Sequence, residues 1–428
     1  MKVLLRALFI FAVLVDGSAG RADEPFYPRD GQTIVFFGDS ITQAGLYVEY
    51  VETFLRTRFP EKSFRVINHG ISSETVSGTS EPDHDPRRPD AHNRFARDVA
   101  AWRPDVLVAC FGMNDGNYHP FERDRFEKYQ AGVRRLIARA RDEAGAALVL
   151  MTPPPFDPYR RGAGDPAAVS FGYKFAAIDY DNTLTEYSRW LVGVREEGFI
   201  VADVHSALNE HLRQRRESRV SFTLSPDAVH PDATGHWLMA QTLLEAWHAP
   251  AECGSVEIDA AGPKAVRGEV SGLARNGEAM EFVWRAPLPL PLDSRCDAES
   301  IALADVAQRL NRQRLTVTAA PAKRYRLIAD GTEIGQFSRD ELAAGIDLTI
   351  YPAMPTNQRA QEVLKLVQER SKLIYTAWRK TIAIGAEDEK AKQDQAAADA
   401  QAEEMDARLR KLCQPIDVKL ELSPADSR

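Results

Sequence analysis

Five short apolar runs in the first half of the chain limit its possible folds more than any other feature. They are Ile34–Phe37, Phe64–Ile67, Asp105–Phe111, Ala147–Met151 and Phe199–Val204, and they are apolar apart from Arg65, Asp105 and Asp203. A continuous apolar run of this length is typical of a strand buried on both faces. Helical patterns alternate with the runs between residues 31 and 248. Strands that alternate with helices over short links predict a parallel sheet.

A serine stands directly after the first run. The motif is Gly38-Asp39-Ser40, and apolar residues then recur at helical spacing from 48 to 55. Ser40 therefore falls where a buried strand ends and a helix begins, at the sheet edge where α/β folds bind ligands. Helix N-terminal amides favour developing negative charge there, which makes Ser40 a candidate nucleophile. The alternative, equally open from this motif alone, is that Ser40 or Thr42 only caps the helix.

Two further motifs lie at the ends of the next two runs. They are Asn68-His69-Gly70 and Gly112-Met113-Asn114-Asp115. The backbone of Gly70 can approach a ligand closely, and the Asn114 side-chain amide can donate to an oxyanion. Taken singly, Gly70 is more typical of an ordinary turn, and Asn114 can equally be an Asx-turn residue. We expect Asp115 to serve the local turn.

A base and its orienting carboxylate are predicted near residue 230. Asp227 and His230 are three positions apart and precede Pro231 and a helical pattern. Three residues are about one turn, so both side chains can point the same way. Asp227 can then hold the His230 ring in one tautomer while the other ring nitrogen faces Ser40. A surface loop pair is the favoured alternative when this motif is taken alone.

Together the four motifs resemble the blocks of the SGNH (GDSL-type) hydrolases, in order, over roughly residues 31–248. The resemblance implies a flavodoxin-like three-layer α/β/α fold with a parallel sheet. It implies that Ser40 is the nucleophile, His230 the base and Asp227 its orienter. It also implies an oxyanion hole formed by the Ser40 and Gly70 amides and the Asn114 side chain. One departure is Ile41, where many members have leucine, a position that we expect to serve packing.

The chemistry implied is a two-step acyl transfer. Ser40 attacks an ester carbonyl, His230 moves the proton, and water clears the acyl-enzyme. This reaction requires no metal and no organic cofactor, so we expect neither.

Composition and termini narrow the function further. The chain has 428 residues and a net charge of −8, which argues against nucleic acid as the main partner. Lys2 and Arg6, an apolar run to Val15 and small residues up to Ala22 have the layout of a secretory signal peptide. An uncleaved anchor is the less favoured alternative. We expect an exported protein, secreted or periplasmic, with no integral membrane segment after signal cleavage, and the sequence leaves its oligomeric state open.

The loop from 78 to 93 follows Gly70 and can line the mouth of the site. Its Asp83-His84-Asp85 run superficially resembles a metal site, but a solvated loop is the better interpretation.

The four cysteines are Cys110, Cys253, Cys296 and Cys413. Cys110 is expected to be a buried free thiol. Among the other three the pairing stays open, with Cys253–Cys296 the weakly preferred bridge if one exists.

Beyond residue 250 the pattern changes to β and then to two long helices. Asp330-Gly331 between two β-like runs predicts a hairpin, and Ser338 to Glu341 predicts a capping box. The second long helix is mostly polar, with Met405, Leu409 and Leu412 as anchors. We expect four parts: a signal peptide (1–22), a catalytic domain (23–250), a β-rich accessory region (251–352) and a helical hairpin with a tail (353–428).

The predicted function is an exported serine esterase that cleaves a short-chain ester, with acetyl favoured and a small molecule or polysaccharide as the alcohol part. The preference for a carbohydrate rests on analogy with exported enzymes of this kind. Alternatives with the same residues are an acyltransferase and a lipase or lysophospholipase. A different class, a non-catalytic envelope or carbohydrate-binding protein, also stays open.

Overall fold

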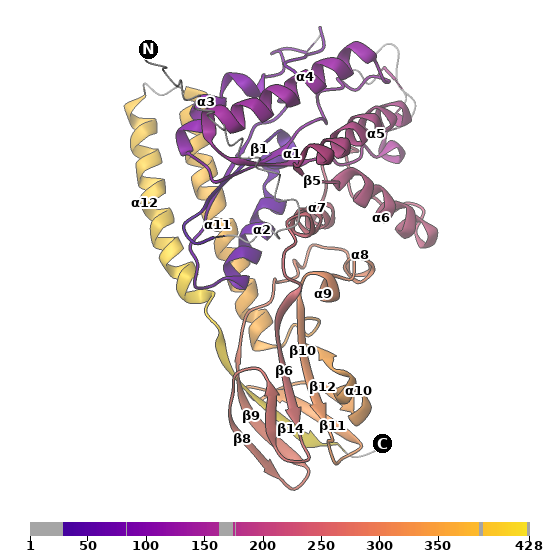
Figure 1. Ribbon diagram of the computed structural model, residues 1–428, viewed down its shortest axis with the longest axis vertical. Helices are drawn as coiled ribbons and strands as arrows, with labels where there is room; N and C mark the ends of the chain where they lie inside the picture. Colours follow the sequence, from indigo (N-terminus) through magenta and orange to yellow (C-terminus); the bar gives the residue numbers. More distant parts are fainter. Residues whose placement is uncertain (1–28, 83, 162–173, 176, 385–387, 426–428) are drawn as a thin grey trace, which may run out of the picture.

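The computed structural model describes residues 29–82, 84–161, 174–175, 177–384 and 388–425. The expected signal peptide lies outside the described residues. Figure 1 shows an α/β domain at the top, a β-rich region below it, and two long helices that run along the side of the α/β domain. Among the described helices, none is both long and apolar enough to cross a membrane.

The α/β domain is built on one parallel sheet of five strands. Their order is β2-β1-β3-β4-β5, which is the flavodoxin-like arrangement. The strands are β1 (Thr33–Gly38), β2 (Arg65–Gly70), β3 (Val106–Cys110), β4 (Ala147–Met151) and β5 (Ile200–Ala202). Each of the five predicted runs forms one of these strands, so the predicted fold class is confirmed. The carboxyl ends of β1, β2 and β3 meet at one edge, where the predicted motifs lie.

Helices cover both faces of this sheet, because alternate strand residues are apolar on each side. One face is covered by α2 (Leu46–Arg58), α6 (Val204–Ser218) and α7 (Ala233–Ala246). The other is covered by α3 (Phe95–Asp98), α4 (Arg123–Arg139) and α5 (Ala177–Gly193). The short helix α1 (Ser40–Ala44) follows β1, and a π-helical turn at Ala140–Ala144 ends α4. Single-turn 3₁₀ helices lie at Ala91–Asn93, Ala100–Trp102, Pro158–Arg160 and Val194–Glu197.

The β-rich region consists of two sheets that enclose one apolar core. The first contains β13 (Ile346–Asp347), β10 (Arg312–Thr318), β6 (Glu252–Asp259) and β7 (Lys264–Arg267), in that order. The second contains β12 (Thr332–Ser338), β11 (Arg324–Ala329), β14 (Ile416–Pro424), β9 (Ala279–Ala286) and β8 (Val270–Asn276). Short helices flank the sheets: α8 (Ala298–Leu303), α9 (Val306–Arg309) and α10 (Arg339–Ala344).

Two local predictions in this region are confirmed. Strands β11 and β12 form a hairpin whose turn residues Asp330 and Gly331 have φ of 47° and 82°. A two-residue turn with both φ values positive matches the twist of the flanking strands. Ser338 caps α10, and its backbone amide in turn donates to Glu341 at 2.7 Å, which completes the capping box.

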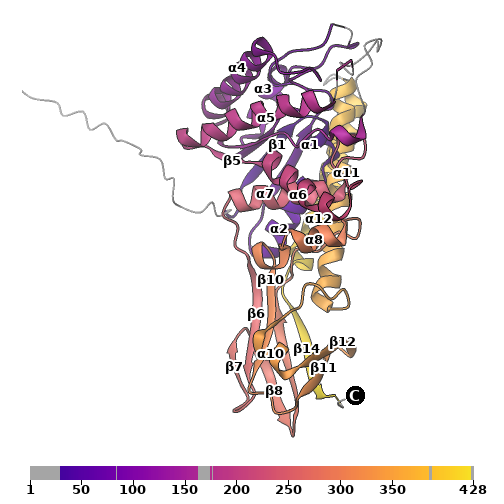
Figure 2. The same cartoon turned by 90° about the vertical axis from the view of Figure 1, so that its right-hand side faces the viewer.

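The two long helices are α11 (Pro355–Ile384) and α12 (Glu389–Leu412), and they pack side by side (Figures 1 and 2). Helix α11 also lies against α2 and the edge strand β2. Of the predicted anchors of α12, Met405 and Leu409 are buried. Trp378 of α11 stacks on His69 with ring centroids 4.2 Å apart.

The last strand differs from the sequence prediction, which placed residues after 412 in a tail. β14 lies in the middle of the second sheet, between β11 and β9. Val418, Leu420 and Leu422 point into its apolar core, while the intervening residues are charged. The end of the chain therefore returns to the β-rich region after the helical hairpin.

The expected preference for a Cys253–Cys296 bridge is not realised. All four cysteines are free thiols. The Cys253 thiol donates to the carbonyl of Leu288 at 3.1 Å, whereas the Cys296 thiol contacts the carbonyl of Ala233. Cys110 is buried in β3, as expected, and burial raises the pKa of its thiol.

Candidate active site

Ser40 is the first residue of α1, directly after β1. The Asp39 side chain caps this helix by accepting from the amide of Ile41 at 2.9 Å. Burial raises the pKa of Asp39 to about 7. Gly38 is needed here, because a Cβ atom would lie 2.6 Å from the carbonyl oxygen of Cys110 in β3. The tight approach of β1 to β3 thus fixes where Ser40 is presented.

His230 and Asp227 lie together beside Ser40. The Ser40 hydroxyl lies 2.9 Å from Nε2 of His230. Nδ1 of His230 lies 2.6 Å from Oδ2 of Asp227, while Oδ1 of that carboxylate accepts from the His230 and Val229 amides. This pairing assigns the ring proton to Nδ1, which leaves Nε2 free to accept the proton of Ser40.

The Asp227 carboxylate remains ionised in this setting. Burial acts to raise its pKa, but the hydrogen bonds from the His230 ring and from the two amides hold the pKa below its usual value. An ionised carboxylate at this place can stabilise the imidazolium that forms when His230 takes a proton.

Asn114 lies after β3, in the turn that Gly112 begins. Its side chain is 3% exposed. Nδ2 donates to the carbonyl of Glu74 at 3.1 Å, which leaves its second N–H for another acceptor. Asp115 accepts from the amide of Ser77 at 2.8 Å, so it serves the local backbone as expected.

The Gly70 amide is not free to act as the oxyanion donor that the sequence predicted. Its amide already donates to Oδ1 of Asn68 at 2.9 Å. A Cβ atom on Gly70 would lie 2.1 Å from the backbone nitrogen of Gln43. Gly70 is therefore glycine because α1 passes directly over it, and its amide is occupied by a local partner.

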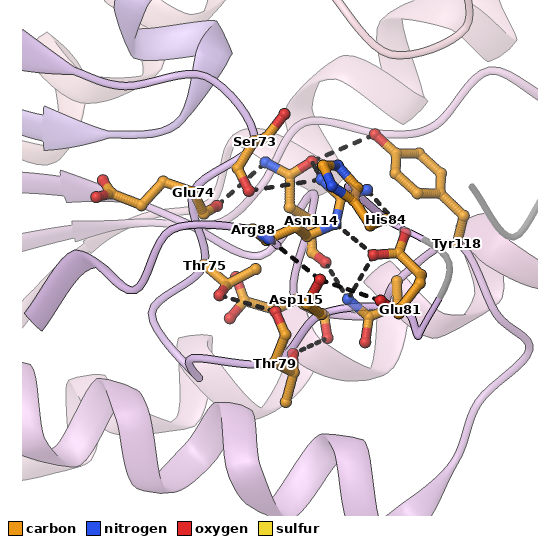
Figure 3. A network of polar contacts seen from close by, with 12 residues as sticks. Ser73, Glu74, Thr75, Thr79, Glu81, His84, Arg88, Asn114, Asp115 and Tyr118 are labelled. Carbon is orange, nitrogen blue, oxygen red and sulfur yellow. Dashed lines mark hydrogen bonds and ion pairs between the residues drawn. The ribbon is translucent and has the colours of Figure 1, made fainter. Parts of the chain in front are cut away.

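Ser73, three residues further on, borders the site instead. It has φ +64°, which is uncommon for a residue other than glycine. Within the described residues no hydrogen bond uses its amide. Glu74, the next residue, accepts from Asn114 through its backbone carbonyl, so the Glu74–Thr75 peptide, directly after Ser73, lies against the Asn114 side chain (Figure 3). The sequence carries no signal for this, because a positive φ at serine cannot be read from composition or spacing.

The loop from 78 to 93 is far more buried than the predicted solvated loop. Glu81, His84 and Arg88 are 2%, 8% and 5% exposed. His84 is buried, and its Nδ1 lies 2.5 Å from the carbonyl oxygen of Pro86. Figure 3 shows that Arg88 reaches the Asn114 side chain from this loop, while Glu81 pairs with Arg88. The loop therefore contacts Asn114 through an internal polar network, and its expected place at the mouth of the site stays a prediction.

No cluster suited to a metal ion is present in the part of the chain that the structure describes: no three His, Cys, Asp or Glu side chains are grouped closely enough. The site is built from a serine, an imidazole, a carboxylate and amide donors.

Comparison with known proteins assigns this domain. The family model described as GDSL-like Lipase/Acylhydrolase matches residues 36–238. Residues 36–238 belong to the GDSL-like lipase/acylhydrolase family. This region of the chain contains Ser40, Ser73, Asn114, Asp227 and His230.

A curated relative of this GDSL-like domain is an acetylxylan esterase of Geobacillus stearothermophilus. It is 27% identical over 241 residues, which cover 50% of this chain and 93% of that enzyme. Together, the family and this relative support an ester-hydrolysing serine hydrolase.

Among solved structures, the chain is similar to BT4096, described as a gut microbial diltiazem-metabolizing enzyme. The TM-score is 0.77 at 22% identity, and the match covers 94% of this chain and 100% of that one. At this identity the likeness concerns the fold alone. Because it spans nearly the whole chain, the β-rich region and the long helices recur together with the GDSL-like domain in another protein.

Proposed function

We propose that the protein is an exported esterase that removes short acyl groups, acetyl above all, from a carbohydrate by serine catalysis. The observation that carries the proposal is the continuous chain of hydrogen bonds from Asp227 through His230 to the Ser40 hydroxyl, at 2.6 and 2.9 Å. Base, orienter and nucleophile in this order are what ester cleavage by serine requires.

In the first half of the proposed reaction, Oγ of Ser40 attacks the ester carbonyl carbon. Nε2 of His230 takes the hydroxyl proton, and Asp227 balances the imidazolium. The tetrahedral intermediate then collapses, the bond to the alcohol oxygen breaks, and His230 returns the proton to that oxygen. The alcohol leaves and the acyl group stays on Ser40.

In the second half, water attacks the acyl-enzyme with His230 again as the base. The carboxylic acid leaves and Ser40 regains its proton. During both halves the negative oxygen lies against fixed donors, for which we propose the Ser40 and Ser73 amides and the Nδ2 group of Asn114. Gly70, the donor expected from the sequence, is left out because its amide is bonded to Asn68.

The substrate class rests on two arguments. The acetylxylan esterase relative is named for an acetylated polysaccharide, and it matches the catalytic part of this chain over most of its own length. The amino-terminal 22 residues have the layout of an export signal, which fits a substrate outside the cell.

The test compares the wild type with Ser40→Ala on p-nitrophenyl esters of increasing chain length and on acetylated xylan. We expect kcat for p-nitrophenyl acetate to fall by about 10⁴-fold or more in Ser40→Ala, with an unchanged Tm. We also expect the wild type to release acetate from the polysaccharide. Wild-type activity in Ser40→Ala would end the serine mechanism, and highest activity at eight carbons or more would replace the acetyl preference with a lipase.

Two further measurements distinguish the remaining alternative functions. Release of the acyl group to an added sugar faster than to water would make the protein an acyltransferase. Failure of a fluorophosphonate probe to label Ser40, together with no turnover of any ester, would leave a non-catalytic binding protein.

A further inference from the structure

Arg88 connects the buried carboxylate of Glu81 with the side chain of Asn114 (Figure 3). Nε and Nη2 of Arg88 donate to the two oxygens of Glu81 at 2.6 and 2.8 Å, which is a two-pronged ion pair. Nη1 donates to Oδ1 of Asn114 at 3.1 Å and reaches the carbonyl of Ser73 at 3.5 Å. The guanidinium thus contacts Asn114 and Ser73, two of the three residues that we propose as oxyanion donors.

These contacts determine which way the Asn114 amide faces. Oδ1 accepts from Arg88, and Tyr118 lies 3.4 Å from the same oxygen, while Nδ2 donates to the carbonyl of Glu74. In the flipped orientation the NH₂ group would face the guanidinium, and the amide oxygen would face a carbonyl oxygen. Both contacts would be repulsive, so only one orientation is compatible with the network.

The same contact strengthens Asn114 as a donor. A cation bonded to an amide oxygen draws electron density from the nitrogen, which makes the remaining N–H more positive. Glu81 binds Arg88 from the side away from Asn114. Once two nitrogens of the planar guanidinium are bound to Glu81, the Arg88 side chain has little freedom to turn away from Asn114.

We propose that Arg88, held by Glu81, is a positioning residue for ester cleavage, which orients and polarises the Asn114 side chain. The inference rests on the proposed oxyanion role of Asn114. Arg88 touches no reacting atom in this scheme, and its effect reaches the substrate only through Asn114.

A merely structural role makes a different prediction. Breaking one partner of a buried ion pair leaves an unpaired charge and destabilises the fold, whatever the pair does for catalysis. The test therefore removes both charges at once, as Arg88→Met with Glu81→Gln, so that no charge stays unpaired. Arg88→Lys is a second variant, which keeps the charge pair but loses the planar fork, and it serves if the first does not fold.

The experiment is a mutant cycle with Asn114→Ala, with p-nitrophenyl acetate as substrate. We expect Asn114→Ala to lower kcat by about 10²- to 10³-fold, as for other side-chain oxyanion donors. The Arg88→Met/Glu81→Gln variant should lower kcat by about 10- to 100-fold with KM within about threefold, and Arg88→Lys should fall between it and the wild type. Adding Asn114→Ala to either variant should lower kcat no further than Asn114→Ala alone does, within about threefold, because Arg88 acts through Asn114.

The results separate the inference from the function it rests on. If Asn114→Ala lowers kcat while the Arg88 variants keep the wild-type kcat, the positioning role is overturned and the oxyanion role stands. If the losses multiply in the combined variants, Arg88 acts independently of Asn114 and the inference is also overturned. If Asn114→Ala itself keeps the wild-type kcat, the oxyanion assignment fails and the inference fails with it.

The matched control is a buried ion pair elsewhere in the same domain. Arg56 and Glu52 of α2 are 2.7 Å apart, with side chains 6% and 3% exposed. Arg56→Met with Glu52→Gln should lower Tm but leave kcat within about twofold. Equal losses of kcat in the two double variants would attribute the Arg88 effect to general loosening and would contradict the inference.

Discussion

Arg370 of α11 lies 3.3 Å from Glu52 of α2, although 318 residues separate them in the chain. Both side chains are buried, at 5% and 3% exposed. Arg370 also pairs with Asp406 of α12 at 3.0 Å, and Arg56 of α2 bonds to Glu52 and Asp406. Two cations and two anions from three helices thus form one closed cluster, which joins the helical hairpin to the GDSL-like domain.

We predict that Arg370→Met destabilises the protein by about 3 kcal/mol. The substitution leaves the buried carboxylate of Glu52 and the partly buried carboxylate of Asp406 with a single cation, Arg56, and an excess buried charge is costly. Urea unfolding followed by circular dichroism measures the loss.

The control for this prediction lies on the same helix. Arg359 pairs with Glu362 at 3.5 Å, with side chains 38% and 62% exposed. Because exposed pairs contribute little, Arg359→Met should change stability by less than about 0.5 kcal/mol. If Arg370→Met and Arg359→Met lower the free energy of unfolding equally, the burial of the charged cluster does not contribute to stability.

The parts of the fold that could be predicted are those set by local patterns. Each of the five runs became a strand of the parallel sheet because a strand in such a sheet needs little more than a largely apolar segment of the right length. The hairpin at Asp330-Gly331 and the capping box at Ser338 were also predictable, since both depend on residues within a few positions of one another.

One error could have been avoided. In β14, Val418, Leu420 and Leu422 alternate with Asp417, Lys419 and Glu421, which is the pattern of a half-buried strand. This alternation directly follows the helical pattern in the sequence.

The environment of Asn114 could not have been predicted. Glu81 and Arg88 lie in an aperiodic loop, and their burial depends on a contact with a turn 26 residues beyond Arg88. We propose Ser73 in place of Gly70 for a similar reason, since only the folded chain reveals that the Gly70 amide is occupied and that α1 crosses it. A role that depends on packing between distant residues produces no local pattern in the sequence, so it cannot be predicted from spacing or periodicity.

Glu49 of α2 predicts a pH-dependent stability. Burial raises the pKa of this carboxyl from its usual 4.5 to about 7. Between these two values only the unfolded chain releases the proton, so the wild type loses stability as pH rises from about 4.5 to about 7, and no further above that.

Glu49→Gln removes this titration. Its stability relative to the wild type should therefore be more favourable at pH 8 than at pH 5, by about 2 kcal/mol. Chemical unfolding of both proteins at the two pH values measures the difference. Glu127→Gln, at a carboxyl that is 62% exposed on α4, is the control and should give the same difference at both pH values. If the stability difference between Glu49→Gln and the wild type is the same at pH 5 and pH 8, Glu49 is not protonated in the folded protein near pH 5.

Asp227→Asn tests how the His230 ring is held. An asparagine Oδ1 can still accept from the His230 and Val229 amides, so Tm should change little. Its NH₂ group, however, would face Nδ1 of His230 and favour the tautomer with the proton on Nε2, which cannot take the proton of Ser40. We expect kcat for p-nitrophenyl acetate to fall by about 10²-fold or more. Activity within about threefold of the wild type would remove Asp227 from the proposed mechanism.

Gly70→Ala and Ser73→Gly separate packing from donation in the loop after β2. A Cβ atom at position 70 would lie 2.1 Å from the nitrogen of Gln43 and 2.5 Å from the carbonyl carbon of Thr42, both backbone atoms of α1. Gly70→Ala should therefore destabilise the protein by about 2–3 kcal/mol. It should also lower kcat, because the helix that it displaces carries Ser40.

Ser73→Gly keeps the amide and suits the φ of +64°, so both kcat and stability should stay close to wild type, kcat within about threefold. Thermal unfolding and p-nitrophenyl acetate turnover of both variants provide the test. A large loss of kcat in Ser73→Gly would assign the role to the Ser73 hydroxyl in place of its amide, while an unchanged Tm in Gly70→Ala would contradict the packing role of Gly70.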